Sequence, residues 1–218
     1  MAVTMKILKN REEWLKNREH SIGGSEASCI LGLNPYCSNV DLYELKKGIR
    51  KPDDLSDNAF VQFGIKAEPL MREMFKLDYP QFEVFYSENN IWHNDKYPYL
   101  HASLDGWLKD DKGRMGIFEN KTVNIQNGSQ LNNWKDRIPD NYYCQLLHYF
   151  LVTEFDFAVL KARLKWQKSD LDIYCQIRHY FIERDDVEDD LKMLESAERE
   201  FFERLKNDKA PSLILPNI

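Results

Sequence analysis

The sequence predicts a single α/β domain, of the α+β kind, in which helices flank a central mixed β-sheet. Helical patterns dominate the first third of the chain, and short segments rich in β-forming residues follow them. A later helix separates this group of strands from a final pair. Hydrophobic residues make up 43% of the 218 residues, which is ample for a core. Because neither a repeat nor a Gly/Ser-rich linker divides the chain, one domain over residues 1–218 is expected.

The first two helices are expected close to the N-terminus. Arg11–Glu19 has a helical pattern that places Trp14 and Arg18, four residues apart, on one face. Two glycines then make a turn, and Ser25 is suited to cap a short helix because its hydroxyl can accept a hydrogen bond from a free backbone N–H. Gly32 is expected to end that helix, since glycine readily adopts the left-handed conformation found at helix C-termini.

Two further helices are expected before the strands begin. Ser38 is suited to cap the first of them, and Gly48 is suited to stop it. Ser56–Leu77 has the pattern of a longer helix. A bend in this helix is expected at Gly64 or Pro69, because these residue types weaken or interrupt helical hydrogen bonding.

The remainder of the chain alternates strands, a loop and helices. The expected strands are Phe82–Ser87, Ile91–His93, Ala102–Leu108, Arg114–Lys121, Phe155–Trp166 and Ile173–Ile182. A hairpin-like connection at Lys109–Gly113 joins the third strand to the fourth, and a polar loop is expected over Val123–Asp140. Helices are expected at Tyr142–Thr153 and at Asp186–Asn207, where apolar residues recur on one side.

The composition excludes several classes of protein. No apolar run approaches the roughly 20 residues of a membrane span, and the N-terminus has no apolar stretch of the kind that signals export. The four cysteines form no C-x-x-C pair, so reduced core or semi-buried thiols are expected instead of a zinc or iron–sulfur site. A cytoplasmic location without membrane contact follows from these observations.

The net charge of −6 argues mildly against nucleic-acid binding, which favours basic surfaces. The objection is weak if carboxylates hold divalent cations, because the ion then supplies the local positive charge. Much of the acidity is also segregated, since Glu183–Asp190 contains six acids and one arginine. The overall charge therefore says little about a surface that could meet DNA.

Asp105, Glu119 and Lys121 form the pattern that is most informative about chemistry. Side chains alternate along a strand, so Glu119 and Lys121 project from one face, and a hairpin places Asp105 on the neighbouring strand close to Glu119. Two converging carboxylates form a hard oxygen site suited to Mg²⁺ or Mn²⁺. Lys121 beside them is suited to orient water or to neutralise negative charge.

The triplet alone is weak, because an aspartate followed by E-x-K also arises by chance on exposed strands with ordinary surface charges. The apolar residues around the triplet favour a metal site over a chance pattern of surface charges. Ile117 and Phe118 precede Glu119, and Trp107 follows closely after Asp105. Charges in such a stretch are costly to bury unless they are paired or bound to metal.

Several segments resemble a known family. Ser103–Gly106 (SLDG) followed by Ile117–Thr122 (IFENKT) is similar to the core of PD-(D/E)xK nucleases, the restriction-endonuclease-like fold. Other segments resemble the lambda-exonuclease and YqaJ-type viral recombinase branch, in the same order along nearly the whole chain. These segments are Trp14, Arg18, Ile22–Ala27, Leu31–Gly32, Asn34–Tyr36, Gly64, Glu68–Pro69, Pro139, Tyr142–Tyr143, Gln145, His148, Val152–Thr153 and Glu183–Asp185.

The resemblance implies a role for each of eight residues. Asp105 and Glu119 are implied as metal ligands, with Lys121 as a catalytic residue. Glu68 is implied to reach the metal site from its helix, and Gln145 to support the site. The resemblance further implies that the 5′-phosphate of a DNA end contacts the side chains of Arg18, Ser25 and Ser103.

The same resemblance implies an activity and partners. The implied activity is Mg²⁺- or Mn²⁺-dependent 5′→3′ digestion of linear double-stranded DNA ends, giving 3′ single strands for recombination in a phage or prophage setting. The implied assembly is a homotrimeric ring that works beside a single-strand annealing protein. The chain departs from the family pattern at Leu104, at Leu147 and at Asn120, and Asn120 puts the packing behind the motif in doubt.

Other interpretations stay open from the residues alone. Glu68 can be a solvated helix acid, Gln145 a buried polar group bonded to backbone, and Ser25 only a helix cap. The five histidines have no metal-binding spacing and are interpreted as packing or surface residues. Another endonuclease of this fold, or a catalytically silent DNA-binding or inhibitor module, would share the pattern. A nucleophile elbow and a P-loop are both absent from the sequence.

Overall fold

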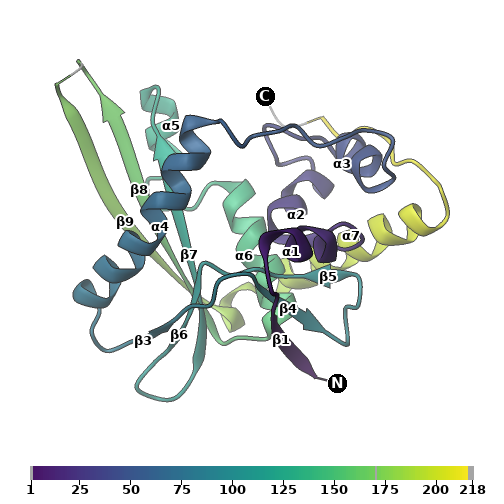
Figure 1. The fold of residues 1–218 in the computed structure, drawn as a ribbon, viewed down its shortest axis with the longest axis horizontal. Coiled ribbons are helices and arrows are strands. Elements are labelled where there is room, and N and C mark those ends of the chain that lie inside the picture. Colours follow the sequence, from purple (N-terminus) through teal and green to yellow (C-terminus); the bar gives the residue numbers. More distant parts are fainter. Residues whose placement is uncertain (1, 170, 216–218) are drawn as a thin grey trace.

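A computed structural model describes residues 2–169 and 171–215 (Figure 1). Its elements in chain order are β1 (Val3–Ile7), α1 (Arg11–Arg18), β2 (Ile22–Gly23), α2 (Gly24–Ile30), α3 (Asn39–Lys46), α4 (Ala59–Asp78), β3 (Glu83–Phe85), β4 (Asn90–Asn94), β5 (Leu100–His101), β6 (Gly106–Lys109), β7 (Met115–Asn124), α5 (Gly128–Asn132), α6 (Asp140–Thr153), β8 (Phe157–Gln167), β9 (Ile173–Glu183), the 3₁₀ helix η1 (Arg184–Val187) and α7 (Glu188–Lys206).

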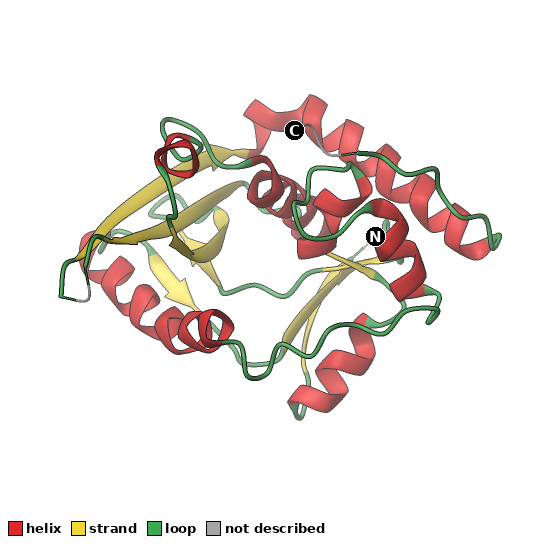
Figure 2. Ribbon diagram, turned by 90° about the horizontal axis from the view of Figure 1, so that it is seen from above, coloured by secondary structure: helices red, strands yellow, loops and turns green. Residues whose placement is uncertain are grey.

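A five-stranded mixed sheet forms the centre of the fold. Its strand order is β3-β6-β7-β8-β9; β7 and β8 run parallel, and the other neighbouring pairs are antiparallel. Helix α6 connects the two parallel strands, as a crossover requires. Figure 2 shows strands of the sheet lying between helices. The predicted fold class, a mixed sheet flanked by helices, is therefore confirmed.

Alternating side chains of the central strands supply two separate cores. Ile117 of β7 and Leu160 of β8 are fully buried on the face that packs against α6 and α7. Their chain neighbours Phe118 and Val159 are fully buried on the other face of the sheet, where Phe75 of α4 covers them. Because β7 is buried on both faces, any polar side chain on it must find a partner or pay a desolvation cost.

The first helices follow the predicted order, with one correction at a cap. The N-cap of α2 is Gly23, not Ser25; the Glu26 carboxylate accepts a hydrogen bond of 2.8 Å from the Gly23 amide. The predicted cap is wrong because Glu26 reaches back to the helix start and α2 already begins at Gly24. Gly32 follows α2 with a φ of +69°, which confirms its role in ending the helix.

The next two helices also form where they are expected. The Ser38 hydroxyl caps α3 by accepting from the Asp41 amide, and Gly48 follows that helix with a φ of +68°. Helix α4 begins three residues later than predicted, because the side chain of Asn58 accepts the first free backbone N–H groups. It continues through Pro69 to Asp78.

The predicted strand Ala102–Leu108 is interrupted. Residues 103–105 lie in an irregular segment between β5 and β6. The side chain of Asn90 causes the break, because its amide donates to the carbonyl of Leu104 and its oxygen accepts from the amide of Leu104, each at 2.9 Å. These two bonds satisfy the backbone groups of Leu104 that would otherwise pair with a neighbouring strand. Asp105 therefore lies just before β6 and not within a strand.

Four short elements, β1, β2, β5 and α5, were not predicted. Strand β1 pairs with β4, and β2 pairs in parallel with β5. The loop expected over Val123–Asp140 contains the last residues of β7 and the short helix α5, whose first turn is capped by Asn127. The strands and helices predicted from Tyr142 onwards all form, with ends within a few residues of the prediction.

All four cysteines are free thiols, as expected. Cys29 and Cys144 are buried, Cys37 is half-buried, and Cys175 on the edge strand β9 is exposed, which differs from the expected burial. Within the described part of the chain, none of the helices is both long enough and apolar enough to cross a bilayer.

Candidate active site

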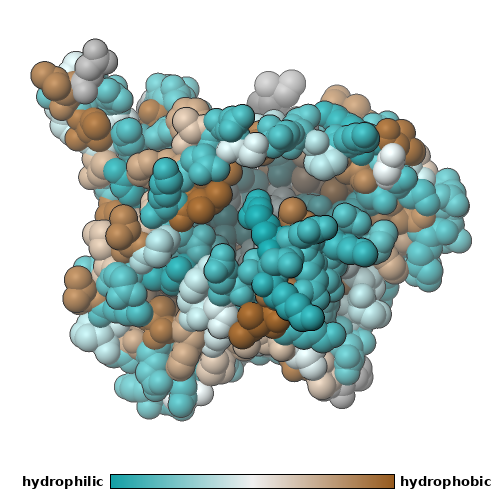
Figure 3. Space-filling view, in the orientation of Figure 1, coloured by the Kyte–Doolittle hydropathy of each residue, from teal (hydrophilic) through white to brown (hydrophobic). Residues whose placement is uncertain are grey.

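A polar cavity of about 450 Å³ opens between α1, α2, α4, α6 and the middle of β7. Figure 3 shows the molecule hollowed on this face, with many hydrophilic residues around the hollow. All eight residues singled out from the sequence line the cavity. They are Arg18 of α1, Ser25 of α2, Glu68 of α4, Ser103 and Asp105 before β6, Glu119 and Lys121 of β7, and Gln145 of α6.

Three side chains on β7 and α6 form a closed hydrogen-bonded cluster. Lys121 Nζ donates to Glu119 Oε1 at 2.7 Å and to Gln145 Oε1 at 2.9 Å. The amide of Gln145 donates to the same Glu119 oxygen at 2.8 Å. The parallel crossover creates this cluster, because it brings α6 back over the strand that carries the other two residues.

Asp105 joins the cluster from the neighbouring chain segment. Its Oδ2 accepts a hydrogen bond of 2.9 Å from the backbone amide of Asn120, which lies between Glu119 and Lys121. The Asn120 side chain points to the opposite face of the sheet, where neither of its polar atoms has a partner among the described residues. The packing doubt raised by this departure from the family pattern is therefore justified, and it concerns the far side of β7.

Burial of the carboxyl groups, and after it their mutual repulsion, dominates the electrostatics of the cavity. Burial, followed by the charge of Asp105, raises the pKa of Glu119 to about 8, although Lys121 opposes the shift. Burial and the charge of Asp105 likewise raise the pKa of Glu68 to about 7. Burial raises the pKa of Asp105 itself. Each ionised carboxylate makes the next one less favourable, so the cavity favours a bound cation.

The donor set fits Mg²⁺ or Mn²⁺. Glu119 Oε2 is buried and has no hydrogen-bond partner among the described residues, so this oxygen is available as a ligand. Asp105 supplies a second carboxylate, and Mg²⁺ commonly binds through one or two carboxylates while keeping several waters. In the described part of the chain no three acidic, histidine or cysteine side chains already converge as a metal cluster, and Glu68 pairs with Arg72 at 2.6 Å.

Arg18 and Ser103 lie along the same wall of the cavity and share a neighbour. The indole N–H of Trp14 donates to the Ser103 hydroxyl at 3.1 Å, and the Arg18 guanidinium carbon lies 4.0 Å from the centre of the Trp14 ring. Ser25 lies in the first turn of α2, beside them in the cavity wall. The three residues therefore share one cavity with the carboxylates.

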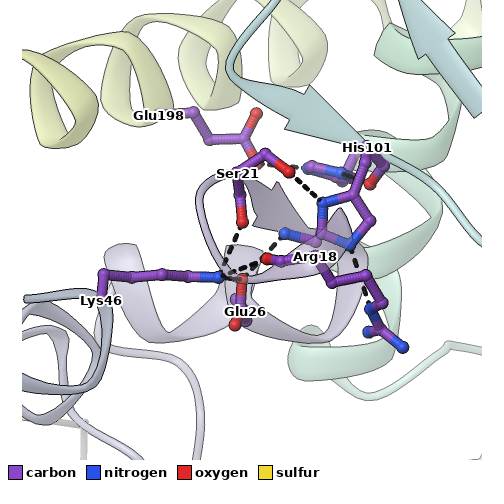
Figure 4. A network of polar contacts seen from close by, with 8 residues as sticks. Arg18, Ser21, Glu26, Lys46, His101 and Glu198 are labelled. Atoms are coloured by element: carbon purple, nitrogen blue, oxygen red, sulfur yellow. Dashed lines mark hydrogen bonds and ion pairs between the residues drawn. The ribbon is translucent and has the colours of Figure 1, made fainter. Parts of the chain in front are cut away.

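Sequence reasoning missed Arg72 and His101. Arg72 Nη1 donates to Glu68 and to the carbonyl of Asp105, at 2.6 and 2.8 Å, and so ties α4 to the segment that carries Asp105. Its position four residues after Glu68 was the available signal. His101 contacts Arg18, as Figure 4 shows, although its sequence spacing carries no such signal.

Tyr149 is buried and also belongs to the cavity. Its hydroxyl donates to the carbonyl of Ser103 at 3.0 Å and accepts from the Gln145 amide at 2.7 Å. It therefore connects the carboxylate cluster to the segment on which Ser103 and Asp105 lie.

Comparison with known proteins gives one family and one fold. The profile of the YqaJ-like viral recombinase domain matches residues 13–156. The chain is 30% identical to the protein YqaJ of Bacillus subtilis (strain 168) over 213 residues, which cover 94% of this chain and 59% of that protein.

Solved structures agree on the fold. The alkaline exonuclease LHK-Exo from Laribacter hongkongensis has a TM-score of 0.63 at 18% identity, covering 90% of this chain and 93% of that one. LHK-Exo in complex with dAMP has a TM-score of 0.61 at 15% identity, with the same coverage. A phage-related exonuclease from Haemophilus somnus 129PT has a TM-score of 0.51 at 14% identity, covering 89% of this chain and 99% of that one.

Proposed function

The chain belongs to the family of YqaJ-like viral recombinase domains, and from this membership we propose that it is a metal-dependent nuclease that digests linear double-stranded DNA from its 5′ ends. The products would be 3′ single strands suited to recombination. The observation that carries the proposal is the hydrogen-bonded cluster of Asp105, Glu119, Lys121 and Gln145 in a polar cavity.

Asp105 and Glu119 would hold Mg²⁺ or Mn²⁺, with Glu68 at the edge of the same cavity. A divalent ion bound there would polarise a phosphodiester oxygen and lower the pKa of a bound water. Lys121 places a cation and N–H donors beside Glu119, where it can hold water or offset negative charge on a phosphate. Gln145 fixes the position of the Lys121 ammonium group through a hydrogen bond of 2.9 Å.

Arg18, Ser25 and Ser103 would bind the terminal 5′-phosphate in the same cavity. A guanidinium and two hydroxyls match the oxygen atoms of a phosphate, and charge-assisted hydrogen bonds are stronger than neutral ones. The 5′ end of the DNA would bind to these three residues, and the carboxylates of Asp105 and Glu119 line the same cavity. This arrangement would set the direction of digestion. The complex of the structural neighbour LHK-Exo with dAMP supports a nucleotide as the occupant.

The proposal extends to assembly and setting. A homotrimeric ring around DNA would retain the substrate despite a net charge of −6, because release then requires passage off an end. A single-strand annealing protein would take over the 3′ strand. A phage or prophage origin and action in the host cytoplasm agree with the viral recombinase family. The chain spans 59% of the length of its Bacillus relative.

Digestion of linear and closed circular DNA, with Mg²⁺ and with chelator, tests the proposal. Degradation of linear duplexes alone, and only with metal, is expected. Cleavage of closed circles would instead assign a restriction-like endonuclease. Binding of metal and DNA without cleavage of any substrate would assign a silent DNA-binding or inhibitor module.

A further inference from the structure

His101 lies directly behind the proposed phosphate-binding residue. Its Nε2 lies 3.1 Å from Nε of Arg18, and its Nδ1 lies 2.7 Å from the hydroxyl of Ser21. Figure 4 shows Arg18 and Ser21 at opposite edges of the ring. His101 is 1% exposed, so this imidazole exchanges no hydrogen bonds with bulk water.

The chemistry of the donors fixes the state of the ring. The Nε–H of an arginine can only donate, so Nε2 of His101 accepts, and the proton must reside on Nδ1, which donates to Ser21. Burial, together with the charge of Arg18, lowers the pKa of His101 to about 2, in agreement with a neutral ring. The imidazole therefore orients Arg18 without cancelling its charge, which a carboxylate in the same place would do.

Trp14 and His101 hold the Arg18 guanidinium, and its two Nη groups stay available to bind a phosphate. Trp14 covers one face at 4.0 Å, and His101 engages Nε. Among residues 2–169 and 171–215, Arg18 forms no ion pair with a carboxylate. The two Nη groups thus keep the fork-like geometry and full charge that suit a phosphate.

The surroundings of His101 are built to keep the ring in place. Its carbonyl accepts from His148 Nε2 at 2.8 Å, and strand β5 pairs it with Gly23 of β2. A Cβ atom at position 23 would lie 2.8 Å from Nε2 of His101, so glycine leaves the space that the ring occupies.

A second set of bonds fixes the other side of the ring. The carbonyl of Ser21 accepts from Lys46 Nζ at 2.7 Å, and Lys46 pairs with Glu26 at 2.8 Å. Glu26 in turn accepts from the amide of Gly23 at the start of α2, the helix that carries Ser25. One network therefore links the imidazole to Arg18 at the end of α1 and to the start of α2.

We propose that His101 is a positioning residue for Arg18, which it orients toward a terminal 5′-phosphate through a neutral hydrogen bond. The inference rests on the proposed function, because it takes the phosphate of a DNA end as the partner of Arg18. It predicts that His101 sets the preference for phosphorylated ends and contributes little to the affinity for duplex DNA as such.

The test is equilibrium binding in chelator, where no cleavage occurs, of hairpin duplexes whose single end carries a 5′-phosphate or a 5′-hydroxyl. The full chain should bind the phosphorylated end roughly tenfold or more tightly, the ratio expected for charge-assisted hydrogen bonds. His101→Leu should reduce this ratio toward one and leave binding of the hydroxyl end within about twofold. His101→Gln should retain most of the ratio, because its amide oxygen can accept from Arg18 at the place of Nε2.

The outcomes separate this inference from the function on which it rests. Loss of the preference in Arg18→Ala together with its retention in His101→Leu would overturn the positioning role alone. An equal loss of binding to both ends in His101→Leu, unrepaired in His101→Gln, would show a purely structural residue and overturn it as well. Equal binding of both ends by the unaltered protein would overturn the inference together with the phosphate site.

Discussion

Lys121 and Glu119 are two residues apart on one strand and form an ion pair between a half-buried lysine and a buried carboxylate, with 2.7 Å between Nζ and Oε1. The lysine thus holds one oxygen of a carboxylate whose other oxygen has no partner among the described residues. An ion pair that leaves an acceptor free is suited to a site that must bind a metal and still stay ordered without it.

Replacement of Lys121 by methionine should lower the rate of DNA cleavage by about 10² or more, the usual cost of removing a group that stabilises developing charge. The side chain keeps its length and loses its charge, so the fold should persist. Lys112→Met, on the exposed hairpin between β6 and β7, is the matched control and should cleave normally. Single-turnover rates with saturating Mg²⁺ give the measurement. A normal rate for Lys121→Met would remove this residue from the site.

Metal binding should be visible without catalysis. Mg²⁺ or Mn²⁺ should raise the melting temperature of the protein, because an ion that binds the folded state alone stabilises it by mass action. Asp105→Asn and Glu119→Gln should lose most of this shift. Thermal melts with metal and with chelator provide the comparison. Equal shifts in the two variants and the unaltered protein would place the ion elsewhere.

Calcium offers a second check on the same site. Ca²⁺ should raise the melting temperature as Mg²⁺ does, yet support little cleavage, because its larger and more flexible coordination positions water poorly. Cleavage assays with each ion, at concentrations that give equal thermal shifts, make the comparison. Full cleavage in chelator would contradict any role for metal.

Arg18→Ala should erase most of the difference in digestion rate between 5′-phosphorylated and 5′-hydroxyl ends. The expected cause is the loss of charge-assisted hydrogen bonds to the phosphate, worth roughly tenfold or more in rate. Lys16→Ala removes a positive charge from the exposed part of the same helix and should leave the preference intact. Digestion of paired substrates that differ only at the 5′ end measures the ratio. A preserved ratio in Arg18→Ala would refute the assignment.

The buried pair of His148 and Glu198 should make stability depend on pH. Their side chains are fully buried, with 2.6 Å between Nδ1 and Oε1. Burial lowers the pKa of His148, but the charge of Glu198 and the hydrogen bonds outweigh it and raise the pKa overall. A raised pKa means that the stabilisation is complete below about pH 6.5, the ordinary value for histidine, and is lost as pH rises through the folded value.

Glu198→Gln should remove this dependence, because burial then keeps His148 neutral, and should destabilise the fold at pH 6 by about 3 kcal/mol or more through loss of the buried charged pair. Glu195→Gln, which breaks a pair of 3.8 Å with Arg199 nearer the surface of α7, should change stability by less than about 1 kcal/mol. Urea titrations between pH 6 and pH 9 measure both effects. A pH profile unchanged by Glu198→Gln would exclude the pair as its source.

A homotrimer is expected in solution. Light scattering coupled to size-exclusion chromatography should give about three times the chain mass of 25.9 kDa. Excess competitor DNA added after digestion has begun should leave the engaged substrate to be degraded further, because an enclosed duplex cannot dissociate sideways. A monomer that stops at once on challenge would end the ring proposal and leave the nuclease proposal intact.

The sequence predicts the long elements well because their patterns are local. Helix α6 and strands β8 and β9 carry apolar repeats over ten or more residues, and the glycines at 32 and 48 end their helices as expected. The short strands β1 and β2 were missed, since their pairing partners lie 78 or more residues away in the chain (Ile22 with Leu100 is 78, Ile7 with Asn90 is 83). Nothing in the local sequence specifies such distant pairs.

The eight residues predicted from motifs line one cavity, but the contacts between them could not be predicted from the sequence. The pairing of Glu119 with Lys121 follows from strand alternation, whereas the hydrogen bond from Gln145 depends on the path of the crossover. The break in the strand before Asp105 depends on one side chain, that of Asn90, which bonds to the backbone of Leu104 fourteen residues later. Patterns of residue type identify which groups are needed, and tertiary hydrogen bonds decide how they meet.

Because α6 connects the parallel strands β7 and β8, the cavity can form only late in the synthesis of the chain. Gln145 and Tyr149 reach the site on α6, and β8 must then pair with β7 to hold that helix in place. A chain that has left the ribosome only as far as Lys121 has every proposed metal ligand and no closed cavity around them. An unfinished chain that ends before α6 therefore lacks the hydrogen bonds of Gln145 and Tyr149, so the proposed site is assembled only after α6 and β8 have been made.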